Sequence, residues 1–165
     1  ALTACFPERI KGLVLINPWF GSDRYLISIQ KLRIKMAEIL DPKTYSEFNS
    51  SLLFPPYYRR MYQQAFEKMA NRATRYPHDP IRIKNRLNAI LEYDARPISD
   101  KIKCPILVIS AEDDQLMPKW FSEKLAATIQ HAQLLVLEKG GHMLMETRGD
   151  IIAGEVKKFS MSIER

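Results

Sequence analysis

The chain has 165 residues, of which 46% are hydrophobic and 10% aromatic, and it carries a formal net charge of +6. A chain of this length and composition can bury one hydrophobic core. No apolar run approaches the roughly 18 to 20 residues that span a bilayer, so we expect no membrane partner. Two cysteines, Cys5 and Cys104, are too few for a disulfide scaffold and predict buried free thiols in a cytoplasmic protein.

The positive charge is concentrated in the middle of the chain. Residues 22–103 hold 16 Lys and Arg against 9 Asp and Glu, whereas the other residues hold 9 against 10. The basic residues form no long run, and no motif for DNA or RNA binding is present, so we expect no nucleic-acid partner. Two interpretations of the charge stay open, a solvated helical surface and a cationic entrance for anionic substrates.

The first half of the chain predicts one strand followed by several helices. Residues 1–9 have the pattern of a helix end, and the short apolar run at 11–17 is typical of a strand buried on both faces. Helical spacing then dominates residues 22–95, where Asp79 followed by Pro80 predicts a helix start. One predicted apolar helix face consists of Leu26, Ile29, Leu32, Met36 and Leu40.

Strands and helices alternate again from residue 97. We expect strands over 106–110 and 134–138, and helices over 118–130 and 146–163. Apolar strands that alternate with helices indicate a parallel sheet with right-handed crossovers, which is an α/β fold.

Two side chains near the ends of these strands could perform acid–base chemistry. Asp114 follows the strand at 106–110, and His142 follows the next strand, directly after Gly140 and Gly141. Ligands collect at the carboxyl ends of strands in open parallel sheets, and an acid beside a histidine forms two members of a catalytic triad. The neighbouring Asp113 is interpreted as a turn or helix-capping acid.

The sequence contains no motif for a metal or a cofactor. It lacks H-E-x-x-H, paired cysteine motifs and glycine-rich phosphate loops, so we expect neither a metal nor a cofactor. His78 lies in a predicted loop, and His131 follows a predicted helix end, where a cation is favourable.

These motifs together resemble the α/β-hydrolase superfamily over residues 1–21 and 97–163. The segment 7–17 is similar to the family's path into its sixth strand, 105–118 to its seventh strand and acid turn, and 141–142 to its histidine loop. The resemblance implies the C-terminal half of an α/β-hydrolase fold, with a short parallel sheet, flanking helices and an inserted helical lid. The implied domains are a partial core at 1–21, the lid at 22–96 and the remaining core at 97–165.

The resemblance also implies a nucleophile on a G-x-S-x-G turn, before the acid and the histidine. That pattern is absent from the 165 residues, and the chain begins on Ala1, so we expect the nucleophile upstream and an inactive chain by itself. The family's fifth strand would pair with residues 12–17. We therefore expect this edge to associate with an N-terminal half or with a second copy.

The Asn17-Pro-Trp19 turn and the aromatic, arginine-rich helices most resemble the aminoacrylate-hydrolase and enol-lactonase branch. This branch implies a small, anionic ester-, amide- or enamine-like substrate. Four aromatic residues are candidates to line its pocket, or alternatively simple core residues: Trp19, Phe20, Tyr57 and Tyr58.

Three other functions stay open. The chain could be a non-catalytic binding or oligomerising module with this fold, or a helical interaction protein in which residues 22–95 carry the function. It could also come from a haloalkane dehalogenase or epoxide hydrolase, whose nucleophile is an aspartate.

Overall fold

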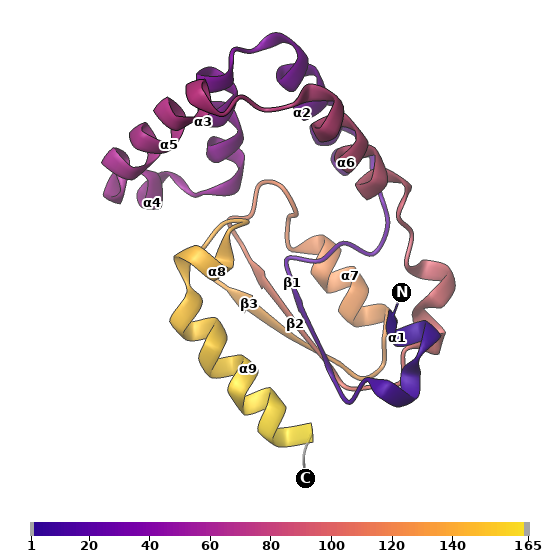
Figure 1. The fold of residues 1–165 in the computed structure, drawn as a ribbon. Helices are drawn as coiled ribbons and strands as arrows, with labels where there is room; N and C mark the ends of the chain where they lie inside the picture. Colours follow the sequence, from indigo (N-terminus) through magenta and orange to yellow (C-terminus); the bar gives the residue numbers. More distant parts are fainter. Residues whose placement is uncertain (1, 164–165) are drawn as a thin grey trace. The chain divides into compact units, whose positions relative to one another are not determined.

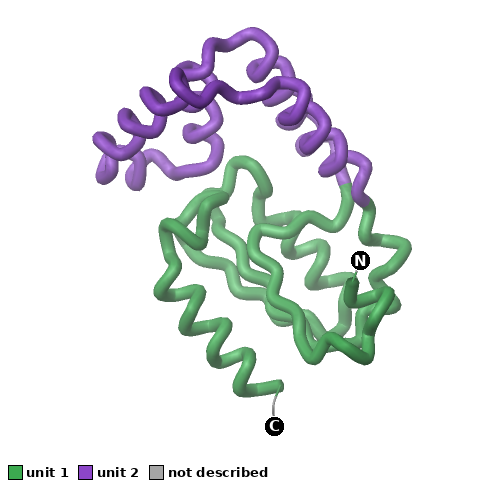
Figure 2. Tube along the Cα trace, viewed as in Figure 1, with its two compact units in different colours: residues 1–21, 94–165 green, residues 22–93 purple. Residues whose placement is uncertain are grey.

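A computed structural model describes residues 2–163 and divides the chain into two compact units. The first unit combines both ends of the chain, up to Gly21 and from Asp94 onward, and the second unit is Ser22–Tyr93 (Figure 2). We call them the sheet unit and the helical unit. The helical unit holds 13 Lys and Arg against 7 Asp and Glu, so its formal charge of +6 equals that of the whole chain.

The sheet unit is built on three parallel strands in the order β1-β2-β3 (Figure 1). β1 spans Leu13–Ile16, β2 spans Ile106–Ala111 and β3 spans Ala132–Leu137. This confirms the predicted α/β fold and its short parallel sheet, although β3 begins two residues before the predicted start. Because the strands are parallel, their carboxyl ends share one edge of the sheet.

Both faces of the central strand β2 are covered, which explains its continuous apolar run. Ile106 and Val108 pack with α7 (Trp120–Thr128) on one face, whereas Leu107 and Ile109 pack with α9 (Gly149–Ile163) on the other (Figure 1). Every residue of β2 is buried. The remaining short helices of this unit are α1 (Leu2–Cys5), α8 (Leu144–Thr147) and the 3-10 turns η1 (Pro7–Arg9) and η2 (Arg96–Lys101).

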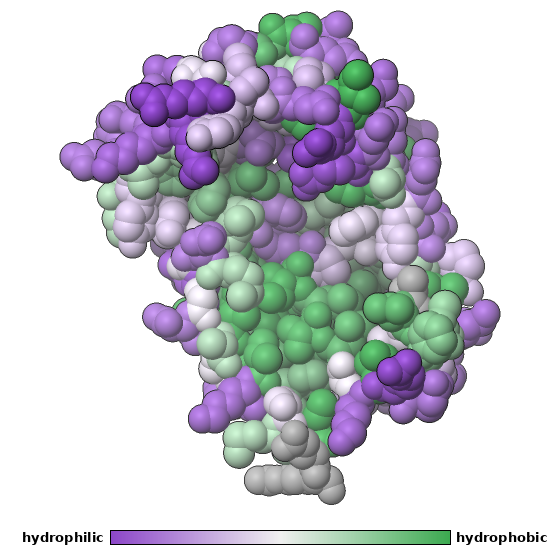
Figure 3. All heavy atoms as spheres, viewed as in Figure 1, coloured by the Kyte–Doolittle hydropathy of each residue, from purple (hydrophilic) through white to green (hydrophobic). Residues whose placement is uncertain are grey.

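Strand β1 lies at an edge of the sheet and is only partly covered. All four of its residues are apolar and half-buried, and hydrophobic side chains gather on the face of the molecule shown in Figure 3. On the side that faces β2, the N–H groups of Leu13 and Asn17 donate to the carbonyl oxygens of Pro105 and Ile109, at 3.0 and 2.8 Å. The alternation of a strand then directs the N–H groups of Val14 and Ile16 outward.

The helical unit contains five helices. They are α2 (Arg24–Ile39), α3 (Pro42–Leu53), α4 (Pro56–Met61), α5 (Gln63–Arg75) and α6 (Pro80–Glu92). Aspartates cap three of them, and the Asp79 side chain accepts hydrogen bonds from two backbone N–H groups at the start of α6. The helix start predicted at Asp79 and Pro80 is therefore confirmed.

The predicted apolar face of α2 is only partly correct. Leu26 is fully buried, but Leu32 is 42% exposed, and Gln30 is buried instead. A polar network explains the difference, because Arg33 donates from Nη1 to Gln30 Oε1 and from Nη2 to Asn49 Oδ1, both at 2.9 Å. Burial lowers the pKa of the Arg33 guanidinium.

The prediction of buried thiols is wrong for Cys5, and Cys104 is only partly buried. Cys5 is exposed in α1, and Cys104 is half-buried; both are free. No helix in the described residues 2–163 has the length and apolar character needed to cross a membrane.

Candidate active site

The acid turn directly follows the central strand. β2 ends at Ala111, and Asp114 lies three residues later with its side chain completely buried. Its Oδ1 accepts hydrogen bonds from the backbone N–H groups of Leu116 and Met117 at 2.8 and 2.9 Å. These two bonds fix the carboxylate and leave Oδ2 to face another group.

The histidine loop follows the neighbouring strand. β3 ends at Leu137, and Gly141 then adopts φ 64°, a left-handed conformation that glycine takes without the penalty of a Cβ atom. This turn brings His142 back to the edge of the sheet. Its side chain is 23% exposed, so the ring is partly accessible.

The structure brings the two predicted catalytic residues into contact. His142 Nδ1 lies 2.9 Å from Asp114 Oδ2, across 28 residues of sequence. An ionised carboxylate only accepts hydrogen bonds, so the neutral imidazole carries its proton on Nδ1 and presents a lone pair at Nε2. Within residues 2–163, Nε2 has no hydrogen-bond partner. The arrangement is that of a general base held in one tautomer.

Two further residues contact the histidine loop, and neither was predicted to have this role. Asn17, at the end of β1, donates from Nδ2 to the carbonyl oxygens of Gly141 and His142 at 3.2 and 2.7 Å. Asp113 Oδ1 accepts from the N–H groups of Gly140 and Gly141 at 2.8 and 2.7 Å. The sequence offered one signal for the role of Asn17, which is that a polar residue directly follows the apolar strand β1.

The four aromatic candidates for substrate binding lie in both units. Phe20 is 3% exposed and packs in the core beside β2, and Trp19 next to it is half-buried. Tyr57 and Tyr58 lie in α4, where the Tyr58 ring stacks on Phe54 with centroids 5.7 Å apart. Contact of any of the four with a substrate stays a prediction.

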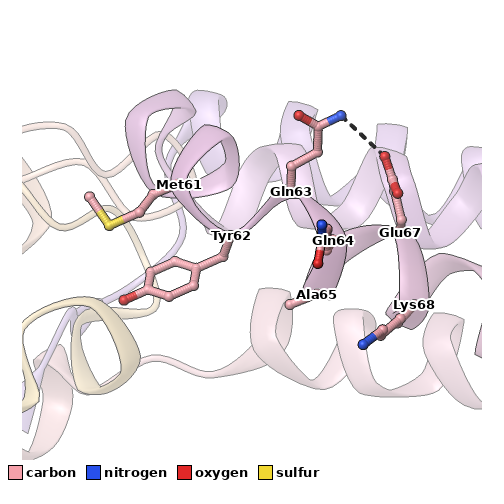
Figure 4. A pocket seen from close by; sticks show the side chains of 7 residues that line it. All are labelled: Met61, Tyr62, Gln63, Gln64, Ala65, Glu67 and Lys68. Carbon is pink, nitrogen blue, oxygen red and sulfur yellow. Dashed lines mark hydrogen bonds between the residues drawn. The ribbon is translucent and has the colours of Figure 1, made fainter.

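The helical unit has an open depression where α4 meets α5, shown in Figure 4. Its lining residues are Met61, Tyr62, Gln63, Gln64, Ala65, Glu67 and Lys68. The dashed line in Figure 4 is the hydrogen bond from Gln63 Nε2 to Glu67 Oε1, 3.1 Å long. The lining offers no paired acid and base.

No group of three or more His, Cys, Asp or Glu side chains in residues 2–163 is arranged to hold a metal ion.

The chain is similar to known proteins in sequence and in fold. The sequence profile of the alpha/beta hydrolase family matches residues 1–155. The proposed carbamate hydrolase RutD of Azorhizobium caulinodans is 26% identical over 151 residues, which are 91% of this chain and 57% of that protein. The chain thus spans little more than half the length of this relative.

Solved structures show the same fold. MGS-M2, an alpha/beta hydrolase enzyme from a deep-sea metagenome library, superposes with a TM-score of 0.82 at 21% identity, covering 95% of this chain and 58% of that one. The enol-lactonase of Burkholderia xenovorans superposes with a TM-score of 0.81 at 22% identity, covering 98% of this chain and 60% of the enol-lactonase chain. With the family profile matching nearly the whole chain, the protein belongs to the alpha/beta hydrolase family.

Proposed function

We propose that this chain supplies the acid and the base of a serine hydrolase triad whose nucleophile lies outside these 165 residues. The contact of His142 Nδ1 with Asp114 Oδ2 at 2.9 Å is the observation that carries the proposal. The absence of a G-x-S-x-G pattern from the sequence supports an external nucleophile, as does the limited share of the relatives that the chain covers.

In the proposed reaction, His142 Nε2 takes the proton of the serine hydroxyl as the serine oxygen attacks the carbonyl carbon. Asp114 stabilises the imidazolium that forms, and Nε2 then returns the proton to the leaving group. The acyl-enzyme is hydrolysed by the same steps, with water in place of the serine.

We propose a small ester-, amide- or enamine-like substrate. The names of the RutD relatives and of the enol-lactonase support C–N and ester-like bonds. The formal charge of +6 on the helical unit would attract an anionic substrate by electrostatic steering. We assign this unit the role of the lid, and the cytoplasm stays the proposed location.

Hydrolysis of 4-nitrophenyl acetate tests the proposed function. The 165-residue chain should hydrolyse it no faster than its His142→Ala variant. A polypeptide that joins this chain to an upstream G-x-S-x-G segment should turn over, and His142→Ala should lower its kcat at least about 1,000-fold. Turnover by the 165-residue chain that His142→Ala abolishes would refute the external nucleophile. Persistent inactivity of the longer polypeptide would favour a binding module or an aspartate nucleophile.

We also propose that the outer edge of β1 pairs with a strand from outside this chain, either an upstream segment or a second copy. The edge residues are apolar and half-buried, and the N–H groups of Val14 and Ile16 point outward by strand alternation. An open apolar edge is a template for strand pairing.

Light scattering on the 165-residue chain tests this pairing. We expect a dimer or larger species, and we expect Val14→Pro to shift it toward monomer. Proline there removes an outward N–H group and leaves the ladder to β2 intact. A wild-type chain that is monomeric across the concentration range would contradict pairing with a second copy.

A further inference from the structure

We infer that Asp113 is a positioning residue for the proposed base, because it holds the loop that carries His142. The inference rests on the proposed function only for its kinetic consequence. It assigns to the first acid of the Asp113-Asp114 pair a role distinct from that of the second.

A single carboxylate oxygen of Asp113 binds two consecutive backbone groups of the loop. Oδ1 lies 2.8 Å from Gly140 N and 2.7 Å from Gly141 N, across 27 and 28 residues of sequence. Hydrogen bonds to an ionised acceptor are shorter and roughly twice as strong as neutral ones. The two bonds therefore tie the loop after β3 to the turn after β2.

The other polar contacts of the loop leave these two N–H groups to Asp113. Thr147 Oγ1 donates to Gly140 O at 2.7 Å, and Asn17 donates to the carbonyl oxygens of the next two residues. Those contacts satisfy carbonyl groups only. Within residues 2–163, Asp113 is the acceptor for both glycine N–H groups, so its loss leaves two donors without a protein acceptor.

The two aspartates act on the same contact, the one between the Asp114 carboxylate and the His142 imidazole. Asp114 is adjacent to Asp113 in the acid turn and binds the imidazole, whereas Asp113 binds the backbone just before the imidazole. The turn that holds the carboxylate thus also sets the place of the ring. Displacement of catalytic groups by about 1 Å can cost about 100-fold in rate, so this coupling should affect the chemical step.

The first test is spectroscopic and needs no nucleophile. It compares Asp113→Ala and Asp113→Asn with Glu112→Ala in the 165-residue chain. Glu112 is a matched control, because it lies in the same turn and pairs with Lys119 at 2.8 Å, away from the histidine loop. The readouts are the NMR resonance of the His142 Nδ1 proton and the hydrogen-exchange rates of the Gly140 and Gly141 amides.

Asp113→Ala should remove or broaden the Nδ1 resonance and accelerate exchange at both glycines by about tenfold or more. Asp113→Asn keeps a carbonyl oxygen as acceptor, so it should retain the resonance with intermediate exchange rates. Glu112→Ala should match the wild type. The inference is overturned if Asp113→Ala leaves the resonance and the exchange rates unchanged, or if Glu112→Ala changes them equally.

If circular dichroism shows that Asp113→Ala does not fold, Asp113→Asn carries the test. Exchange at Gly140 and Gly141 must then exceed the wild-type rate, and a rate equal to wild type overturns the inference.

The second test is kinetic, in a polypeptide that includes the nucleophile. Asp113→Ala should lower kcat about 100-fold while KM stays within about twofold, and Asp113→Asn should restore most of kcat. A rise in KM with kcat unchanged would contradict a positioning role. If the NMR results hold but no variant of the longer polypeptide is active, the proposed function fails while the link between Asp113 and the loop stands.

Discussion

Asp114→Asn separates the tautomer of His142 from the stability of the fold. In the wild type, Asp114 Oδ1 accepts hydrogen bonds from the backbone N–H groups of Leu116 and Met117, and Asp114 Oδ2 faces His142 Nδ1. In the variant, the amide oxygen must take the Oδ1 position, because an NH2 group there would face two donors. The amide NH2 group is therefore directed at His142.

This reversal forces the imidazole into the wrong tautomer. A donor opposite Nδ1 requires a lone pair on Nδ1, so the neutral ring carries its proton on Nε2. An Nε2 that already carries a proton cannot accept one from a nucleophile. In proteases with a Ser-His-Asp triad, this substitution lowers kcat by about 10,000-fold, or about 5 kcal/mol of transition-state stabilisation. We expect a loss of kcat of the same order in a polypeptide that also includes the proposed serine nucleophile.

The free energy of unfolding should be close to the wild-type value in Asp114→Asn and clearly lower in Asp114→Ala. Asparagine keeps an oxygen that accepts from the N–H groups of Leu116 and Met117, whereas alanine removes it. Both donors would then be buried without an acceptor, because Leu116 is 2% exposed and Met117 is 3% exposed. At about 1–3 kcal/mol for each buried unsatisfied group, Asp114→Ala should lose about 2–6 kcal/mol.

Two measurements on the 165-residue chain check this reasoning. The 15N shifts of the His142 ring should show the proton on Nδ1 in the wild type and on Nε2 in Asp114→Asn. Urea unfolding should place Asp114→Asn near the wild type and Asp114→Ala well below it. A variant ring that keeps its Nδ1 proton, or an alanine variant as stable as the asparagine one, would refute the argument.

Three further predictions concern stability and reactivity. Asp79→Ala removes the cap of α6 and should lower the free energy of unfolding by about 1 kcal/mol in urea; an unchanged value would contradict the capping role. Gly140→Ala places a Cβ against a methyl group of the buried Leu144 and should lower the free energy of unfolding by about 1–3 kcal/mol. Gly154→Ala is the control, because its Cβ meets nothing within 4 Å, and it should leave the free energy of unfolding unchanged or raise it. Iodoacetamide at pH 7 should label Cys5 faster than Cys104, because Cys5 is exposed and burial raises the pKa of the Cys104 thiol. Labelling of Cys104 should accelerate as pH rises, and equal rates by mass spectrometry would count against this.

The contact between Asp114 and His142 was predictable because it follows from topology. Parallel neighbouring strands end at the same edge, so residues shortly after β2 and β3 must lie near one another. The turn glycines at 140 and 141 marked the loop that allows the final approach.

The role of Asp113 was not predictable from local pattern. An acid in a turn commonly accepts hydrogen bonds from nearby backbone groups, and this is the role predicted for Asp113. Its partners are 27 and 28 residues away, and only the register of β2 with β3 brings them together. Similarly, hydrophobicity placed Leu32 on the buried face of α2, whereas the network of Gln30, Arg33 and Asn49 selected another face.

A kinetic double-mutant cycle on Asp114 and His142 tests the central claim most directly, in a polypeptide that also includes the proposed serine nucleophile. Residues that act as one unit show strongly non-additive losses. We predict that the double alanine variant has the same kcat/KM as His142→Ala, within about threefold, because the carboxylate acts only through the imidazole. If the two losses multiply instead, the side chains act independently, and the account of a base held by its acid is wrong.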